Sequence, residues 1–269
     1  MVDARNSAIG VFDSGIGGLT VAHAIIRQLP AESVVYFGDT ARVPYGPKSP
    51  DTVRRYSQEI ADFLQSQGVK AIVIACNTAT AHALTMLREK LPIPVIGVVE
   101  PGARAAVKAT KTNRIGVIGT VGTIKSGAYE RAIRALNPDA IITARAAPLL
   151  VPLIEEGWND HPASRLVVEE YLQPFKAADI DTLVLGCTHY PLIKPLIAEV
   201  LGDSVQLIDS AAETAAETAR TLNDKGLSTS DGHEPAHRFI ASDDPLMFLQ
   251  LGQRFLGDTI EGVEVRTLG

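Results

Sequence analysis

The sequence predicts an α/β protein made of two similar three-layer α/β domains with mostly parallel sheets. Short β-rich runs alternate with helical stretches along the chain, which is typical of parallel sheets covered by helices. Most of these runs are continuously apolar, as expected of strands that are buried on both faces. Matching motifs also occur in the same order in the two halves of the chain, which indicates an internal repeat.

The expected strands are short runs rich in branched apolar residues. They cover residues 8–12, 34–38, 71–75, 95–99, 115–118, 140–144, 182–185, 205–208, 238–241 and 262–266. A helix is expected from Pro50, because Ser49 suits the N-cap and Gly68 provides a stop. Further helices are expected over residues 18–29, 79–90, 100–109, 124–136, 164–177, 191–200, 211–224 and 244–256, and an exposed loop over 225–237.

Three pairs of motifs define the internal repeat. GVFDSGIGG at 10–18 resembles GVIGTVGT at 116–123, VIACNTATA at 73–81 resembles VLGCTHYPL at 184–192, and VIGVVEP at 95–101 resembles VQLIDSA at 205–211. The matched landmarks are Asp13 with Gly119, Cys76 with Cys187 and Val98 with Ile208. We therefore predict a first domain of residues 1–98 plus 211–269 and a second of residues 99–210. The two would be related by a pseudo-two-fold axis, with the active site in the cleft between them.

Composition and charge exclude several classes of function. The chain of 269 residues has 25 basic and 31 acidic side chains, and the net charge of −6 argues against direct nucleic-acid binding. No apolar run approaches the length of a membrane span and no secretion signal is visible, so we expect no membrane partner and a cytoplasmic location. Neither a metal-binding spacing nor a nucleotide phosphate loop is present, so no metal is expected. No lysine is singled out for pyridoxal phosphate, although the residues alone leave that cofactor open.

The two cysteines are the most informative residues. Cys76 and Cys187 each follow an apolar strand and precede an expected helix, where the helix dipole lowers the pKa of a thiol. One such cysteine alone would be interpreted as a packed core residue. Two at equivalent places in repeated halves indicate function instead. One base and one acid on opposite faces of a carbon suit racemisation or epimerisation, and thiols serve both purposes.

Other candidates lie where strands are expected to end. Asp13 opens a Gly-rich turn, where it would either cap the next helix or place a carboxylate beside Cys76. His189 lies two residues after Cys187 and would be a proton partner or a cap, whereas Glu155 is expected to be a solvated helix residue. Candidate binding groups with simpler structural alternatives are Tyr45, Gly46, Thr120 and Thr123.

Several of these motifs together resemble the glutamate racemase family, part of the cofactor-independent aspartate/glutamate racemase superfamily. They are DSGIGG at 13–18, FGDTARVPYGPKS at 37–49, ACNTATA at 75–81, GVIGTVGT at 116–123, GCTHYPL at 186–192 and LIDSA at 207–211. The resemblance runs from about residue 8 to at least residue 211. It implies an isomerase that interconverts L- and D-glutamate without a cofactor by a two-base mechanism and supplies D-glutamate for peptidoglycan.

The resemblance also implies roles for individual residues. Cys76 would take the α-proton from D-glutamate with help from Asp13. Cys187 would take it from L-glutamate with help from Glu155 and His189. The implied substrate-binding residues are Asp13, Ser14, Tyr45, Gly46, Asn77, Thr78, Thr120, Thr123, Thr188 and His189.

Three alternatives stay open on the sequence. The same chemistry would serve another acidic amino acid, such as aspartate. An additional binding role is suggested by the family, since some glutamate racemases inhibit DNA gyrase. A nucleotide-binding domain is suggested only by the Gly-rich turn at 15–20. The family also implies a homodimer.

Overall fold

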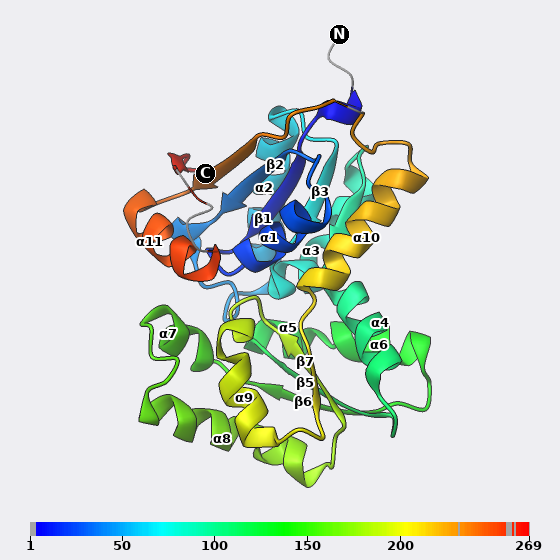
Figure 1. Cartoon of the computed structure of the whole chain (residues 1–269), viewed down its shortest axis with the longest axis vertical. Helices are drawn as coiled ribbons and strands as arrows, with labels where there is room; N and C mark the ends of the chain where they lie inside the picture. Colours follow the sequence, from blue (N-terminus) through cyan, green and yellow to red (C-terminus); the bar gives the residue numbers. More distant parts are fainter. Residues whose placement is uncertain (1–3, 231, 257–259, 261, 269) are drawn as a thin grey trace. The chain divides into compact units, whose positions relative to one another are not determined.

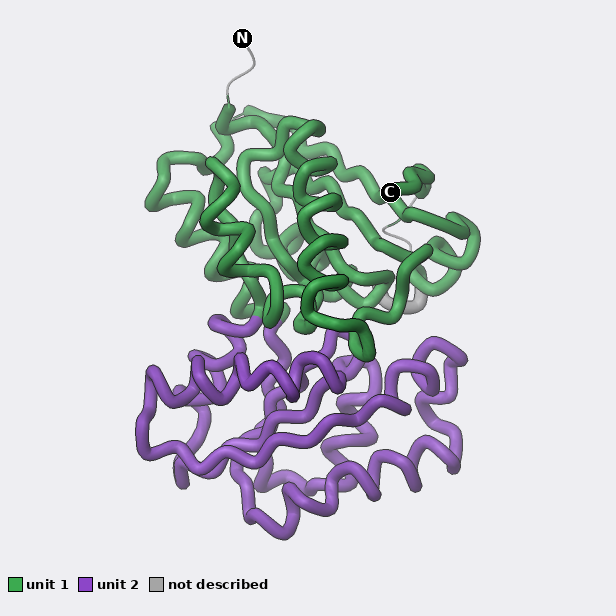
Figure 2. Tube along the Cα trace, turned by 180° about the vertical axis from the view of Figure 1, so that it is seen from behind, with its two compact units in different colours: residues 1–98, 211–269 green, residues 99–210 purple. Residues whose placement is uncertain are grey.

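The computed structural model describes residues 4–230, 232–256, 260 and 262–268. It divides into two compact units (Figure 2). Unit 1 comprises Met1–Val98 and Ala211–Gly269, and unit 2 comprises Val99–Ser210. The chain therefore leaves unit 1 once and returns to it after unit 2.

Unit 1 is built on a parallel sheet with the strand order β10-β9-β2-β1-β3-β4. Its strands are β1 (Ile9–Asp13), β2 (Val34–Gly38), β3 (Ala71–Ile74), β4 (Val95–Gly97), β9 (His237–Ala241) and β10 (Glu264–Val265). Because all described pairs are parallel, the carboxyl ends of these strands share one edge of the sheet. That edge is where ligands bind in open α/β sheets.

Helices cover both faces of this sheet (Figure 1). They are α1 (Leu19–Gln28), α2 (Pro50–Ser66), α3 (Asn77–Lys90), α10 (Ala211–Asp224) and α11 (Pro245–Leu256). Successive strand residues alternate between the two cores: Val11 packs with α1, α10 and α11, while Phe12 packs with α2 and α3. Burial on both faces explains why the strands are continuous apolar runs.

Helix α2 follows the expected local chemistry. It begins at Pro50, and the side chain of Ser49 caps it by accepting a hydrogen bond from the Thr52 amide. Gly68 follows its end with φ of +73°, a left-handed conformation that suits glycine. The predicted start and stop of this helix are confirmed.

Unit 2 repeats this plan around a sheet with the order β6-β5-β7-β8. Its elements are β5 (Arg114–Gly119), β6 (Ile141–Ala146), β7 (Thr182–Gly186), β8 (Gln206–Ile208), α4 (Val99–Ala109), α5 (Val121–Ser126), α6 (Ala128–Leu136), α7 (Leu150–Glu155), α8 (Pro162–Ala177) and α9 (Lys194–Leu201). One core contains residues of α4 and α6, and the other contains residues of α7, α8 and α9. The predicted α/β class with two parallel sheets is confirmed.

The strand registers relate the two units residue by residue. The order β2-β1-β3-β4 in unit 1 corresponds to β6-β5-β7-β8 in unit 2. Phe12 lies opposite Ile74 in unit 1, and Ile118 lies opposite Leu185 in unit 2. Cys76 lies two residues after Ile74, and Cys187 lies two residues after Leu185. The two cysteines therefore occupy the same position of the repeat.

One landmark of the sequence comparison is out of register. Val73 pairs with Ile96, and its counterpart Val184 pairs with Ile208. The equivalent of Ile208 is therefore Ile96 rather than Val98. These two short strands share an apolar pattern that tolerates a shift of two residues without changing which side chains face inward.

Every predicted strand is present, with ends shifted by no more than two residues, but three helical segments differ. The stretch expected at 124–136 is two helices, because Gly127 adopts φ of +64° between α5 and α6. The stretch at 191–200 begins with a 3₁₀ turn, Tyr190–Ile193, before α9. Helix α7 contains Glu155, which was expected in a helix, but no bounds were predicted for a helix in this segment.

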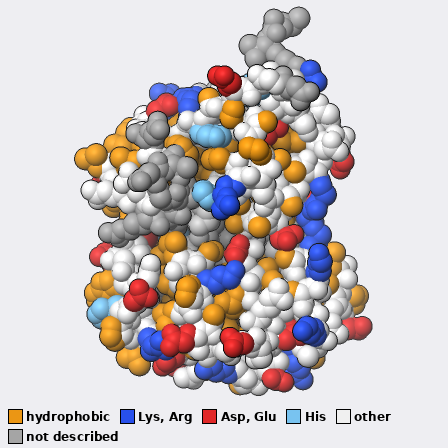
Figure 3. Space-filling view, viewed as in Figure 1, with side chains coloured by type: hydrophobic (Ala, Val, Ile, Leu, Met, Phe, Trp, Pro, Cys, Tyr) orange, Lys and Arg blue, Asp and Glu red, His pale blue; other side chains and the backbone are white. Residues whose placement is uncertain are grey.

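The surface of the described part matches the composition. Among the described residues, no helix is long and apolar enough to cross a membrane. Basic and acidic side chains are interspersed on the face drawn in Figure 3. This agrees with the small net charge of −6.

Candidate active site

Cys76 lies at the carboxyl end of β3, where it is the N-cap residue of α3. Its Sγ atom accepts a hydrogen bond from the Ala79 amide at 3.4 Å and lies 3.7 Å from Oγ of Ser14. The thiol is buried, with 6% of the residue exposed. The amide and the positive end of the helix dipole both favour negative charge on the sulfur. Asn77 and Thr78 follow it, buried in the first turn of α3.

Asp13 is the last residue of β1 and is fully buried. Its Oδ1 atom accepts a hydrogen bond from the Gly15 amide at 3.0 Å. Helix α1 starts later, after Gly18, and has no side-chain cap. Asp13 therefore holds the Gly-rich turn that precedes α1.

Close packing at Gly18 and a hydrogen bond from Tyr36 fix the turn after Asp13. A Cβ atom added to Gly18 would lie 2.4 Å from Cβ of Asp13, so only glycine fits there. The hydroxyl of Tyr36 donates a hydrogen bond to the Gly15 carbonyl at 2.8 Å. Burial, together with the charges of Asp13 and Cys76, raises the pKa of Tyr36, so this hydroxyl remains a neutral donor.

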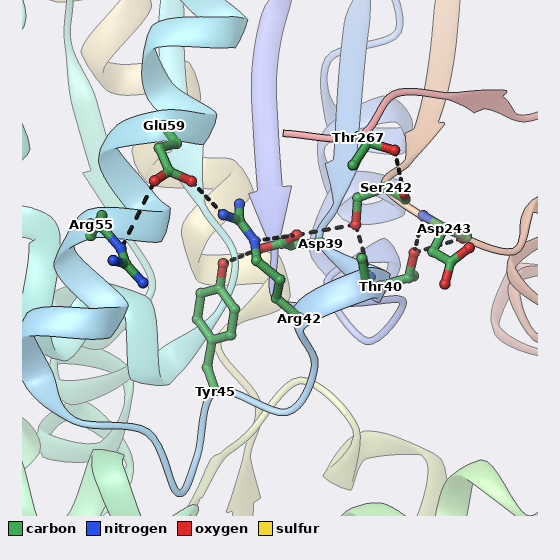
Figure 4. Close-up of polar contacts among 10 residues, drawn as sticks. Asp39, Thr40, Arg42, Tyr45, Arg55, Glu59, Ser242, Asp243 and Thr267 are labelled. Atoms are coloured by element: carbon green, nitrogen blue, oxygen red, sulfur yellow. Dashed lines mark hydrogen bonds and ion pairs between the residues drawn. The ribbon is translucent and has the colours of Figure 1, made fainter. Parts of the chain in front are cut away.

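Tyr45 and Gly46 lie in the loop between β2 and α2. Tyr45 is buried and packs in the same apolar cluster as Cys76, while Gly46 is partly exposed. The Tyr45 hydroxyl donates to the carboxylate of Asp39, a residue that sequence analysis did not single out (Figure 4). Burial, followed by the charge of Asp39 and the hydrogen bond to it, raises the pKa of Tyr45 far above its ordinary value.

Cys187 occupies the equivalent position in unit 2, after β7, and is also buried. Its Sγ atom lies 3.9 Å from Nδ1 of His189. Nε2 of His189 lies 2.9 Å from Oε1 of Glu155, the last residue of α7. Thiol, imidazole and carboxylate therefore form a hydrogen-bonded chain.

The electrostatics of this chain favour an imidazolium. Burial lowers the pKa of His189, but the hydrogen bonds and charges of Cys187 and Glu155 outweigh burial and raise the pKa to about 10. A cation beside Cys187 stabilises its thiolate. Glu155 is a helix residue as expected, the last of α7. The expectation that it is solvated is wrong, because its carboxylate bonds to His189 and its side chain is only 33% exposed. His189 makes no capping hydrogen bond.

The two cysteines precede different kinds of helical element. Cys76 caps α3, a helix of 14 residues, whereas Cys187 comes shortly before a 3₁₀ turn of four residues. The helix expected over 191–200 is present as α9, and the 3₁₀ turn lies between Cys187 and this helix. Beside Cys187 the imidazolium of His189 supplies a positive charge that has no counterpart among the contacts described for Cys76.

Three threonines lie at the same strand ends of unit 2. Thr120 caps α5, and its Oγ1 atom accepts from the Thr123 amide at 3.2 Å. Oγ1 of Thr120 also lies 3.0 Å from Oγ1 of Thr123, which is buried. Thr188 lies buried between Cys187 and His189. Each unit thus gathers hydroxyl groups beside its cysteine.

The comparisons with known proteins identify the family. Residues 9–218 match the family model described as Asp/Glu/Hydantoin racemase. The chain belongs to this family. It is 54% identical to glutamate racemase of Neisseria meningitidis serogroup A over 98% of both chains. The structure of glutamate racemase isoform RacE1 from Bacillus anthracis matches at 46% identity with a TM-score of 0.93, over 98% of each chain.

A second solved relative was determined with an amino acid bound. Glutamate racemase from Francisella tularensis, in complex with D-glutamate, is 40% identical and has a TM-score of 0.91, again over 98% of each chain. The chain is accordingly an amino-acid racemase, an isomerase. Within the described ranges, no group of three or more His, Cys, Asp and Glu side chains is arranged to hold a metal ion.

Proposed function

We propose that this racemase interconverts L- and D-glutamate without a cofactor, with Cys76 and Cys187 as its two proton-transferring groups. The observation that carries the proposal is the equivalence of the two thiols, each two residues beyond the same paired position of the repeated sheet. A two-base reaction needs two groups of similar acidity at an acidic carbon, and a repeated fold supplies such a pair.

Each direction of the reaction begins at a different thiol. For D-glutamate, the Cys76 thiolate would take the α-proton and the Cys187 thiol would give its proton to the opposite face of the carbon. For L-glutamate, Cys187 would be the base and Cys76 the acid. After either turnover one thiol has gained a proton and the other has lost one. Exchange with solvent then restores the starting state.

The neighbours of the two thiols suit these tasks. Asp13 lies at the strand end beside the turn of Ser14, which contacts Cys76. In unit 2, the charged pair of His189 and Glu155 stabilises the Cys187 thiolate and holds a proton close to it. We propose that these three residues assist proton transfer.

Removing an α-proton places negative charge on the carbon and its carboxylate, and this charge needs hydrogen-bond donors. The amides at the start of α3 and α5 and the nearby hydroxyl and amide side chains are such donors. We propose that the substrate is bound by Asp13, Ser14, Tyr45, Gly46, Asn77, Thr78, Thr120, Thr123, Thr188 and His189. We further propose that the two units are the two domains of the enzyme.

The substrate assignment is supported by relatives of high identity. Glutamate racemases of Neisseria and Bacillus match over nearly the whole chain. The aspartate racemase of Picrophilus torridus is 20% identical and resembles this chain in fold alone. Glutamate is therefore favoured over aspartate. We propose that the D-glutamate formed serves peptidoglycan synthesis in the cytoplasm.

A cofactor-free assay tests this proposal. The purified protein is incubated with L-glutamate, and separately with L-aspartate, while optical rotation is followed. We expect L-glutamate to lose its rotation and L-aspartate to keep it, and we expect Cys76→Ala and Cys187→Ala each to abolish the change. A Cys187→Ala protein that racemises glutamate at the wild-type rate would overturn the two-thiol mechanism. Faster turnover of aspartate would overturn the substrate assignment.

A further inference from the structure

Asp39 is a fully buried carboxylate that directly follows β2, at the same sheet edge as Asp13 and Cys76. Its two oxygens accept hydrogen bonds from Nε of Arg42 at 3.0 and 2.8 Å. Oδ1 also accepts from the Ser242 hydroxyl at 3.1 Å, and Oδ2 accepts from the Tyr45 hydroxyl (Figure 4). A buried charge with this many donors is strongly held in place.

The groups around Asp39 join three separate segments of unit 1. Arg42 also bonds to Glu59 on α2, and its guanidinium lies 4.0 Å from the centre of the Tyr56 ring. Ser242 directly follows β9, and its hydroxyl accepts from the Ala41 amide at 2.8 Å. The loop is thus fastened to α2 on one side and to the C-terminal part of the chain on the other. We call Asp39, Arg42, Tyr45, Glu59 and Ser242 the Asp39 network.

The Asp39 network limits what Tyr45 can do. A phenol has one proton to donate, and Tyr45 donates it to Asp39. The same hydroxyl therefore cannot donate to a substrate carboxylate. The Tyr45–Gly46 segment also carries main-chain amides, which are hydrogen-bond donors. The direction of these amides depends on how firmly the loop is held.

We propose that Asp39 is a positioning residue that fixes the Tyr45–Gly46 segment in the orientation needed to bind substrate, with Arg42 and Ser242 holding Asp39 itself. This inference rests on the proposed function, in which Tyr45 and Gly46 contact glutamate. Asp39 acts on the substrate only through the loop. Its loss should therefore weaken substrate binding more than it slows proton transfer.

The test is the Asp39→Asn variant, which keeps the size of the side chain but removes its charge. Hydrogen exchange of the peptide spanning residues 39–48 reports whether the loop has loosened, and steady-state kinetics report the consequence. We expect faster exchange in this peptide and a KM for glutamate raised about 10- to 100-fold, with a smaller change in kcat. Ser242→Ala should change both quantities in the same direction but less.

Tyr45→Phe tests the coupling between Asp39 and the loop. The phenylalanine retains the ring and loses only the hydroxyl that bonds to Asp39. If Asp39 acts through Tyr45, the Asp39→Asn/Tyr45→Phe double variant should have a KM close to that of the worse single variant. If the two substitutions acted independently, their fold-increases in KM would multiply in the double variant. That result would overturn the inference. Ser242→Ala and Tyr45→Phe also decide the matter if Asp39→Asn does not fold.

Asp181→Asn is the matched control, because Asp181 is another carboxylate that holds a loop by several hydrogen bonds, at the amino end of β7 in unit 2. It should leave KM unchanged. Faster exchange in residues 39–48 of Asp39→Asn with an unchanged KM would show a purely structural role and overturn the inference. A raised KM with unchanged exchange would overturn it as well. A wild-type protein that leaves glutamate unchanged would overturn the proposed function instead, while the exchange data would still decide whether Asp39 holds the loop.

Discussion

Nε2 of His189 lies 2.9 Å from Oε1 of Glu155, and the opposite nitrogen of the same ring faces the thiol of Cys187. The carboxylate orients the ring and stabilises its positive charge, which in turn stabilises a thiolate. The imidazolium thus connects a partly exposed carboxylate with a buried sulfur. Unit 1 has a different arrangement, in which Cys76 caps α3.

We predict that His189→Asn lowers kcat/KM for glutamate by about 100- to 1000-fold, because the cation beside Cys187 is lost. Glu155→Gln should lower it less, since Gln still bonds to the ring but no longer stabilises its charge. Enantiomers have equal free energy, so the loss in kcat/KM must be the same in both directions. Polarimetry starting from each enantiomer measures it.

His161→Asn is the control for this substitution. His161 is exposed and caps α8 through a bond from the Ala163 amide, a task that Asn also performs. It should turn over glutamate at the wild-type rate. A His189→Asn protein that turns over glutamate as fast as His161→Asn would show that the imidazolium is dispensable.

The hydrogen-bonded pair of His189 and Glu155 also predicts how stability depends on pH. The pKa of His189 is raised in the folded protein from 6.5 to about 10, so the folded state binds its proton more tightly than the unfolded state. Its contribution is complete below pH 6.5 and is lost as the pH rises through 10. Urea unfolding should show the advantage of wild type over His189→Asn shrinking by a few kcal/mol across this window. If the difference in free energy of unfolding between wild type and His189→Asn stays constant from pH 6 to 10, the positive charge assigned to His189 is refuted.

Asp181 predicts a pH dependence of the free energy of unfolding with the opposite sign to that of His189. Burial raises its pKa, but hydrogen bonds from Thr110, Lys111 and Thr112 outweigh burial and hold the pKa well below its ordinary value of 3.8. Asp181→Asn should therefore reduce the free energy of unfolding by about 1–2 kcal/mol at pH 7. The deficit should narrow as the pH falls below 3.8, because wild type then loses the same interaction. Asp51→Asn, at a carboxylate 92% exposed, should change stability by less than about 0.5 kcal/mol.

Gly18→Ala tests the packing beneath Asp13. The backbone of Gly18 has φ of −65°, which any residue adopts, so space alone excludes a side chain. The new Cβ would lie 2.4 Å from Cβ of Asp13 and 2.9 Å from Cβ of Ala75. We expect a loss of about 1–3 kcal/mol in the free energy of unfolding and a fall in racemisation as Asp13 is displaced. Gly262→Ala, which meets no atom within 4 Å, should leave both unchanged.

The strands and the positions of the cysteines were predictable because they depend on local patterns. A strand buried on both faces is a continuous apolar run, as in β3, and the residue after it lies at the ligand-binding edge. The bounds of helix α7 were not predicted, because its six residues are too few for a periodic pattern and include Pro152. The break at Gly127 depends on a single backbone angle, φ of +64°.

The supporting residues of the candidate site were less predictable because their contacts join distant parts of the chain. Glu155 and His189 are 34 residues apart, and Asp39 and Ser242 are 203 apart. Local sequence patterns do not predict contacts between such distant residues. Analysis of the residues alone therefore placed Glu155 in solvent and did not single out Asp39. The family resemblance supplied Glu155, and the structure added Asp39.

The fate of the α-hydrogen during the first turnovers in D₂O tests the two-thiol mechanism most directly. L-glutamate is incubated with the enzyme to low conversion, and the deuterium at Cα is measured by mass spectrometry in each separated enantiomer. With two bases, the product receives its hydrogen from a solvent-exchanged thiol, so D-glutamate carries deuterium while recovered L-glutamate keeps protium. Equal labelling of both enantiomers, or D-glutamate without deuterium, would mean that a single base acts and would contradict the mechanism.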